Sequence, residues 1–168
     1  MIDRDHLRLM AGYNRWQNRS LYGAAATLDD AARRAERGAF FGSIHGTLSH
    51  LYWGDSIWMH RFMGWPKPEG TIRESSRFRP DWDALVADRA VLDQAILDWA
   101  DSVPADWIGG EMRWFSGALG REMSHPNWLL AVHFFNHQTH HRGQVHAMLT
   151  AAGARPEDTD LILMSAKG

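Results

Sequence analysis

Five of the chain's ten histidines lie in one stretch, residues 133–146, which reads HFFNHQTHHRGQVH. Neutral imidazole is a common ligand of zinc, nickel, copper and iron, and histidine also serves as a general base near neutral pH. Two histidines four residues apart on a helix are close enough to bind one ion. This stretch could therefore supply a metal site, a catalytic base, or simply a histidine-rich helix, depending on which side chains face the core.

The direction of each histidine follows from the helical turn of about 100° per residue. His141 falls inside an apolar arc on this helix, and His137 lies at the edge of that arc. The arc is formed by Leu130, Phe134, Val145 and Met148. We therefore expect His137 and His141 to face the core, where each needs a polar partner. The spacing alone does not decide between a shared metal ion and ordinary hydrogen bonds.

A third metal ligand would have to come from another helix, and residues 43–63 are the best candidate. This segment contains His45, His50, Asp55 and His60. Asp55 falls within its apolar arc, whereas His45 and His50 lie on either side of that arc, so the helical wheel does not choose among them. Gly46 and Gly54 lie one turn on either side of His50 and leave room there for an ion, a ligand or a closely packed helix.

The elements that must position these residues are four long segments with helical spacing. They span about residues 3–28, 43–63, 81–103 and 124–152. Residues 107–123 are rich in glycine and serine and predict a short β-hairpin. We expect an all-α fold, a four-helix bundle with a short β-hairpin insertion before the last helix, in a single domain over residues 1–168. Bundles of this kind build metal sites from side chains on facing helices.

Composition excludes several classes of protein. The formal net charge of −2 gives no basic surface for nucleic acid, and no apolar stretch approaches the length of a membrane span, so we expect neither partner. The chain has no cysteine, which rules out thiolate ligands and a cysteine nucleophile within it and fits a reducing, cytoplasmic location. The first ten residues, MIDRDHLRLM, do not resemble a signal peptide.

Four further residues are candidates for the surroundings of the site. Asn14 and Gln17 interrupt the apolar seam of the first helix, so they either line a pocket and orient a ligand or form hydrogen bonds between helices. Asp55 could accept a proton from a ligand histidine or pair with an arginine. Trp53 could form a pocket wall, with core packing as the alternative.

Three stretches of the sequence resemble the DinB/YfiT-like family of damage-inducible, metal-binding four-helix-bundle proteins. They are YNRWQN (residues 13–18), FFGSIHGTLSHLYWGDSIW (residues 40–58) and NHQTHHRGQ (residues 136–144). In this family one histidine of the second helix and the HxxxH pair of the last helix hold the metal. The resemblance therefore implies one divalent ion, zinc or nickel, bound by His50, His137 and His141.

The same resemblance carries expectations about activity. Relatives include S-transferases that use low-molecular-weight thiols, so it implies a metal-dependent enzyme of the thiol S-transferase or hydrolase type, acting on a small-molecule substrate or thiol. It also implies a homodimer, and it assigns no catalytic residue beyond the ligands. The alternative is a non-catalytic metal-binding or dimerisation module with a structural ion, which would normally be closed by a fourth protein ligand.

Overall fold

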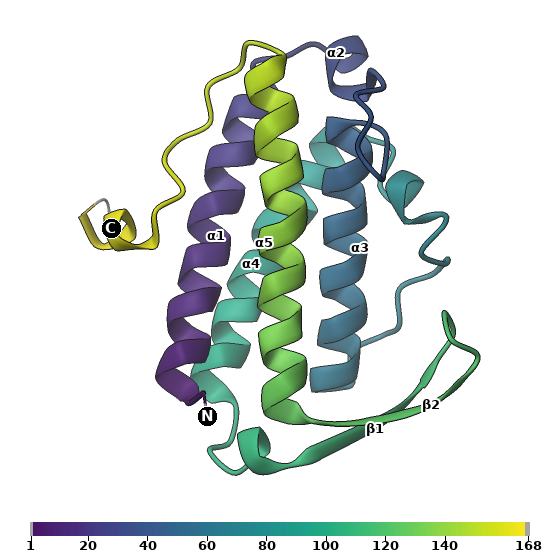
Figure 1. Cartoon of the computed structure of the whole chain (residues 1–168), viewed down its shortest axis with the longest axis vertical. Coiled ribbons are helices and arrows are strands. Elements are labelled where there is room, and N and C mark those ends of the chain that lie inside the picture. Colours follow the sequence, from purple (N-terminus) through teal and green to yellow (C-terminus); the bar gives the residue numbers. More distant parts are fainter. Residues whose placement is uncertain (1, 167–168) are drawn as a thin grey trace.

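In the computed structural model, which describes residues 2–166, four long helices form a bundle (Figure 1). They are α1 (Arg4–Ala26), α3 (Ile44–Met63), α4 (Trp82–Ser102) and α5 (Asn127–Ala151). The shorter elements are the helix α2 (Asp30–Arg34) and the 3-10 turns Ser75–Arg77, Trp107–Gly109 and Leu161–Ala166. The predicted helical bundle with a hairpin before its last helix is confirmed.

Local sequence signals set the ends of the helices. The Ser43 side chain accepts a hydrogen bond from the backbone N–H of Gly46 and so begins α3, and Asp81 caps α4 in the same way through Ala84. Helix α3 ends at Gly64, which takes a left-handed conformation with φ of 68°. These caps satisfy backbone groups that have no partner within the helix.

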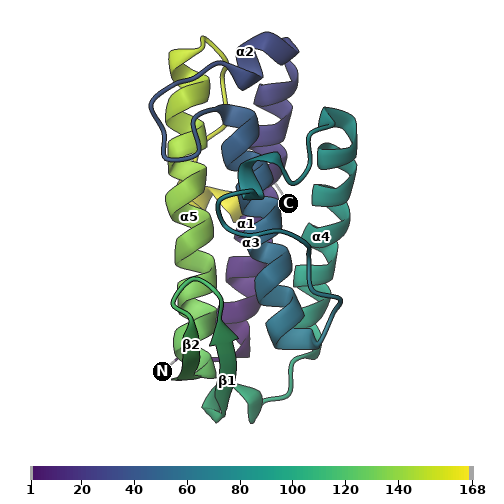
Figure 2. The same cartoon turned by 90° about the vertical axis from the view of Figure 1, so that its right-hand side faces the viewer.

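The hairpin consists of β1 (Glu111–Ser116) and β2 (Arg121–Pro126), which pair in antiparallel register from Glu111 opposite Pro126 to Ser116 opposite Arg121. Helix α5 consequently begins at Asn127, three residues later than the sequence pattern suggests. Residues 124–126 pair with β1 instead of starting the helix, and Pro126 has the extended ψ of 138°. Figure 1 shows the hairpin curving beneath the ends of α3 and α5, and in Figure 2 it lies in front of the lower part of α5.

Apolar side chains fill the bundle in two clusters. The cluster near the hairpin is rich in aromatic residues and includes Trp58, Phe62, Trp99, Phe134 and Phe135. The cluster at the other end is mainly aliphatic and includes Leu21, Ile44, Leu48, Val145 and Leu149. Within the described residues, no helix is both long enough and apolar enough to cross a membrane.

Buried charges join three of the four long helices through the middle of the bundle. The Arg89 guanidinium on α4 lies 2.7 Å from the Asp55 carboxylate on α3 and 2.8 Å from that of Asp93 on its own helix. Asn14 and Asn18 of α1 donate hydrogen bonds to Asp93 at 3.0 and 2.9 Å. Because buried charges are costly unless paired, this network favours one relative arrangement of α1, α3 and α4.

Candidate metal centre

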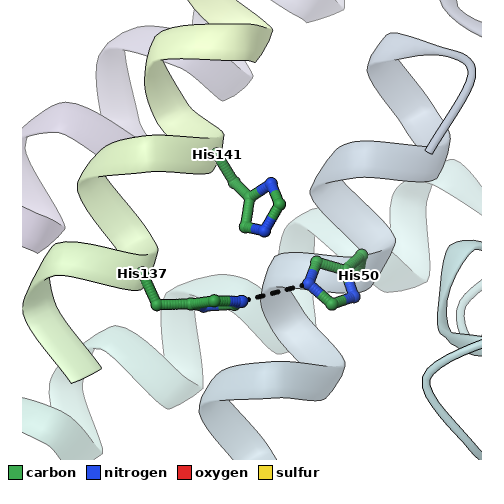
Figure 3. A group of neighbouring side chains, drawn as sticks. All are labelled: His50, His137 and His141. Carbon is green, nitrogen blue, oxygen red and sulfur yellow. Dashed lines mark hydrogen bonds between the residues drawn. The ribbon is translucent and has the colours of Figure 1, made fainter. Parts of the chain in front are cut away.

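Three histidine side chains from two helices meet on the face between α3 and α5 (Figure 3). His50 comes from α3, and His137 and His141 come from successive turns of α5. One ring nitrogen from each lies within 4.8 Å of the other two. The Nε2 atoms of His50 and His137 are 3.2 Å apart, and the ring centroids of His50 and His141 are 4.7 Å apart. The structure thus brings together the trio that the family resemblance implies.

Two glycines of α3 allow this close approach. A Cβ atom on Gly54 would lie 3.1 Å from Cε1 of His137, so the absence of a side chain makes room for that ring. A Cβ atom on Gly46 would lie 2.5 Å from the carbonyl oxygen of Phe41, the residue that covers His50. The space predicted beside His50 is therefore occupied by the ring of His137 and by the backbone before α3.

A hydroxyl group fixes the tautomer of His50. Nδ1 of His50 lies 2.8 Å from Oγ of Ser75, and that hydroxyl donates its only proton to the carbonyl oxygen of Ile72 at 2.6 Å. Ser75 must therefore accept a proton from Nδ1 of His50. The proton on Nδ1 leaves Nε2 with a lone pair, which is the form of imidazole that binds a metal ion.

His141 is oriented in a similar way. Its Nδ1 lies 2.8 Å from Oε1 of Gln144, one turn further along α5, and donates a proton to that oxygen. Its Nε2 is left with a lone pair that faces the other two rings (Figure 3). Nδ1 of His137 is buried and has no hydrogen-bond partner among the described residues. Two of the three rings therefore have a partner that holds the ligating nitrogen in place.

The surroundings keep these imidazoles neutral. Burial, followed by the neighbouring histidines, lowers the pKa of His50 to about 3. Burial also lowers the pKa of His137 to about 3, with His141 as the next cause, and it lowers the pKa of His141. All three rings are consequently uncharged at neutral pH, so a metal ion does not have to displace the extra proton of an imidazolium.

Aromatic side chains line the site. The ring of Phe41 stacks on that of His50 with a centroid distance of 3.7 Å. The indole of Trp53 lies 6.4 Å from the same imidazole and donates a hydrogen bond to the carbonyl oxygen of Glu69 at 2.9 Å. Trp53 is thus beside the site and is also held by the loop after α3. These rings lower the local polarity and strengthen electrostatic interactions at the histidines.

The remaining histidines of α3 are engaged elsewhere. His45 is hydrogen-bonded through Nε2 to the carbonyl oxygen of Arg79 at 2.7 Å, and His60 is hydrogen-bonded to the carbonyl oxygen of Trp65. Asp55 forms its ion pair with Arg89. The alternatives that helical spacing left open for the third ligand are therefore used in other contacts, and His50 alone joins the pair on α5.

Asn14 and Gln17 make contacts between elements of the bundle. Besides its bond to Asp93, Asn14 accepts a hydrogen bond from the Arg142 guanidinium of α5. Gln17 donates to the carbonyl oxygen of Asp158 in the C-terminal segment at 2.9 Å. Hydrogen bonding between helices and to the C-terminal segment, one of the two roles predicted for these residues, is therefore present in the structure.

Sequence reasoning missed three residues of the site: Phe41, Ser75 and Gln144. Phe41 belongs to the stretch that resembles the family but has no polar group to suggest a role. Ser75 lies in a polar loop where any serine could face solvent. Gln144 follows His141 at a spacing of three residues, a signal for side-chain contact on a helix that could have been used.

The donor set suits a borderline-soft divalent ion such as zinc or nickel, because all three donors are neutral imidazole nitrogens. Two of them are oriented by Nδ1 hydrogen bonds, as is usual for metal-ligating histidines. Within the described part of the chain, no fourth histidine, aspartate or glutamate joins the group. Such an arrangement fits a metal site with a position open to another molecule.

Comparison with known proteins identifies the family of the chain. A family model described as the DinB family matches residues 1–167, nearly the whole chain. No match was found among curated proteins or among solved structures. Since the family match covers the four helices, the hairpin and all three histidines, the chain belongs to the DinB family.

Proposed function

We propose that this protein binds one divalent ion, zinc or nickel, through Nε2 of His50, His137 and His141. We further propose that it is a metal-dependent enzyme of the low-molecular-weight thiol S-transferase or hydrolase type. The observation that carries the proposal is the convergence of three neutral imidazoles without a fourth ligand among the described residues. Three protein ligands are typical of catalytic zinc sites, whereas structural sites usually have four.

A bound divalent ion would supply Lewis acidity, which lowers the pKa of a coordinated water or thiol. Residues of the chain do the rest. Ser75 and Gln144 hold the Nδ1 protons of two ligands, so their Nε2 lone pairs stay directed inward. Phe41 excludes water from one face of His50 by stacking on it. The incoming partner would be a small molecule or a low-molecular-weight thiol, since the chain has no cysteine of its own.

Cobalt substitution tests the open position. A thiolate that coordinates cobalt adds a charge-transfer absorption band, so the cobalt protein can be titrated with cysteine, glutathione and coenzyme A. We expect the band with at least one thiol, and none in His137→Ala treated in the same way. No spectral change with any thiol, combined with a fourth protein ligand in a metal-bound structure, would favour a structural ion over a catalytic one.

The proposal also includes a homodimer. Several large apolar side chains are exposed, among them Phe40 at 81% and Val91 at 72% of their surface. Burying such side chains against a second copy would be favourable. Light scattering should give the mass of two chains at micromolar concentration, and a monomer under the same conditions would contradict this part of the proposal.

A further inference from the structure

One guanidinium group near the candidate metal centre has no acidic partner. Arg61, in the last turn of α3, forms no ion pair or hydrogen bond with any described residue, whereas Arg79 and Arg89 are paired with carboxylates. Its side chain is half-buried, and burial lowers the pKa of Arg61. A partly desolvated cation without a counter-charge is unfavourable by itself, and an anion would stabilise it.

Two indole rings flank this guanidinium. Cζ of Arg61 lies 4.5 Å from the ring centroid of Trp58 and 5.4 Å from that of Trp114 in the hairpin. The two indoles themselves are in edge contact at 5.9 Å. A cation over an aromatic ring is stabilised there without using its N–H donors, so these donors stay available for a bidentate contact with a carboxylate or phosphate.

A series of side-chain contacts connects Arg61 to the three histidines. Arg61 is eleven positions after His50, which corresponds to a rotation of roughly 20°, so both lie on one face of α3. The ring of His133 contacts Trp58 at 5.1 Å and lies 6.1 Å from His137, one turn along α5. Because arginine side chains point back along a helix, the guanidinium lies over Trp58, roughly 10 Å along the axis from the histidines.

We propose that Arg61 is a specificity-determining residue that binds an oxyanion, a carboxylate or a phosphate ester, on the molecule whose other end reaches His50, His137 and His141. This inference rests on the proposed function, because it assigns the substrate class of the same site. The substrate would be a small molecule with a metal-binding group at one end and an anionic group roughly 10 Å away. Trp58 and Trp114 would contact the apolar part in between.

Probes of matched length test this inference. The series is ω-mercaptooctanoate, ω-mercaptooctyl phosphate and ω-mercaptooctanol, which share a thiol and a chain and differ in the charge of the far end. Titration calorimetry on the zinc-loaded protein should show an anionic probe binding about tenfold more tightly than the alcohol. Preference for the carboxylate or for the phosphate ester would identify which oxyanion the site accepts.

Variants locate the effect. The preference for the anionic probe should disappear in Arg61→Gln, fall partly in Arg61→Lys, which keeps the charge but loses the planar fork, and persist in Arg113→Gln. Arg113 is a matched control because it lies in β1 of the same hairpin, is exposed and pairs with Glu111. Thermal unfolding of each variant shows whether the fold is retained. Equal binding of all three probes by the wild type, or a preference unchanged in Arg61→Gln, would overturn the inference.

A metal-free experiment separates this inference from the proposed function. Octanoate and octanol lack the thiol, and their binding to the metal-free protein can be followed by tryptophan fluorescence. An octanoate preference that depends on Arg61 supports the anion site even if the protein binds no zinc, in which case only the proposed metal chemistry fails. Normal zinc binding with no Arg61-dependent preference in either experiment would refute the anion site and leave the metal site standing.

Discussion

The Nε2 atoms of His50 and His137 lie 3.2 Å apart, although 87 positions separate the two residues in the chain. Two neutral imidazoles that face each other so closely need a proton or a cation between them, because their lone pairs repel. Ser75 keeps the proton of His50 on Nδ1, so its Nε2 has only a lone pair to offer. A proton on His137 would satisfy this one pair of nitrogens, whereas a divalent ion would satisfy all three histidines.

Loss of the Ser75 hydroxyl should weaken metal binding without unfolding the protein. In Ser75→Ala, Nδ1 of His50 loses its acceptor, and the ring is free to change tautomer or rotate. Changes to such orienting partners typically cost about 10- to 100-fold in metal affinity. Competition with a chromogenic chelator measures this, with Ser76→Ala as the neighbouring control. Equal affinities in Ser75→Ala and the wild type would show that this hydrogen bond does not orient the ligand.

Gly54→Ala should also reduce metal affinity, although alanine favours the helix. The new Cβ would lie 3.1 Å from Cε1 of His137 and would displace that ring. Gly143→Ala is the matched control, because Gly143 is also helical and its Cβ would meet nothing within 4 Å. The control should gain up to about 1 kcal/mol of stability from helix propensity and bind metal normally. If both variants bind metal like the wild type, the close packing of Gly54 against His137 is not needed.

The stability of the metal-free protein should fall in acid. Burial lowers the pKa of His50 and His137 from 6.5 to about 3, so between these values the folded protein binds fewer protons than the unfolded chain. Their contribution to stability is therefore complete above pH 6.5 and is lost as the pH falls from 6.5 towards about 3. Urea denaturation across this range should show a decline that is smaller in His137→Leu than in His6→Gln. An equal decline in the two variants would exclude His137 as its source.

Arg89→Met should destabilise the bundle strongly. The substitution leaves the carboxylates of Asp55 and Asp93 buried without their cation, and breaking a buried pair in this way costs on the order of 3–5 kcal/mol. Arg8→Gln is the comparison, since Arg8 pairs with Asp101 at an exposed position, where a loss of at most about 1 kcal/mol is expected. Chemical denaturation measures both. Similar losses in the two variants would mean that the buried network adds little to stability.

The fold could be predicted from local signals in the sequence. The apolar periodicity of the four long helices is a property of short segments, and the structure confirms these helices. The caps at Ser43 and Gly64, which set the ends of α3, are local features as well. The start of α5 could not be predicted from residues 124–126, because their pairing with β1 is a contact between two segments. Local propensity is overridden where such a contact satisfies more backbone hydrogen bonds.

The candidate site, too, could be predicted only where it depends on local spacing and not where it depends on contacts between segments. The pairing of His137 with His141 follows from their spacing on one helix, so the sequence alone indicates it. The choice of His50 over His45 or Asp55 depends on how α3 is rotated against α5 and on which partners the loop before α4 provides. Ser75 in that loop is hydrogen-bonded to His50, and the carbonyl oxygen of Arg79 in the same loop is hydrogen-bonded to His45. The helical wheel of α3 contains none of this information, and only the family resemblance pointed to His50.

The metal content of the purified protein tests the central claim most directly. Protein expressed without a histidine tag should contain about one zinc or nickel ion per chain by elemental analysis. The content should fall to background in His137→Ala and His141→Ala and drop sharply in His50→Ala, while His140→Ala, a change at an exposed neighbour on α5, should retain it. Unchanged metal content in all three ligand variants, each shown to be folded, would contradict the three-histidine site.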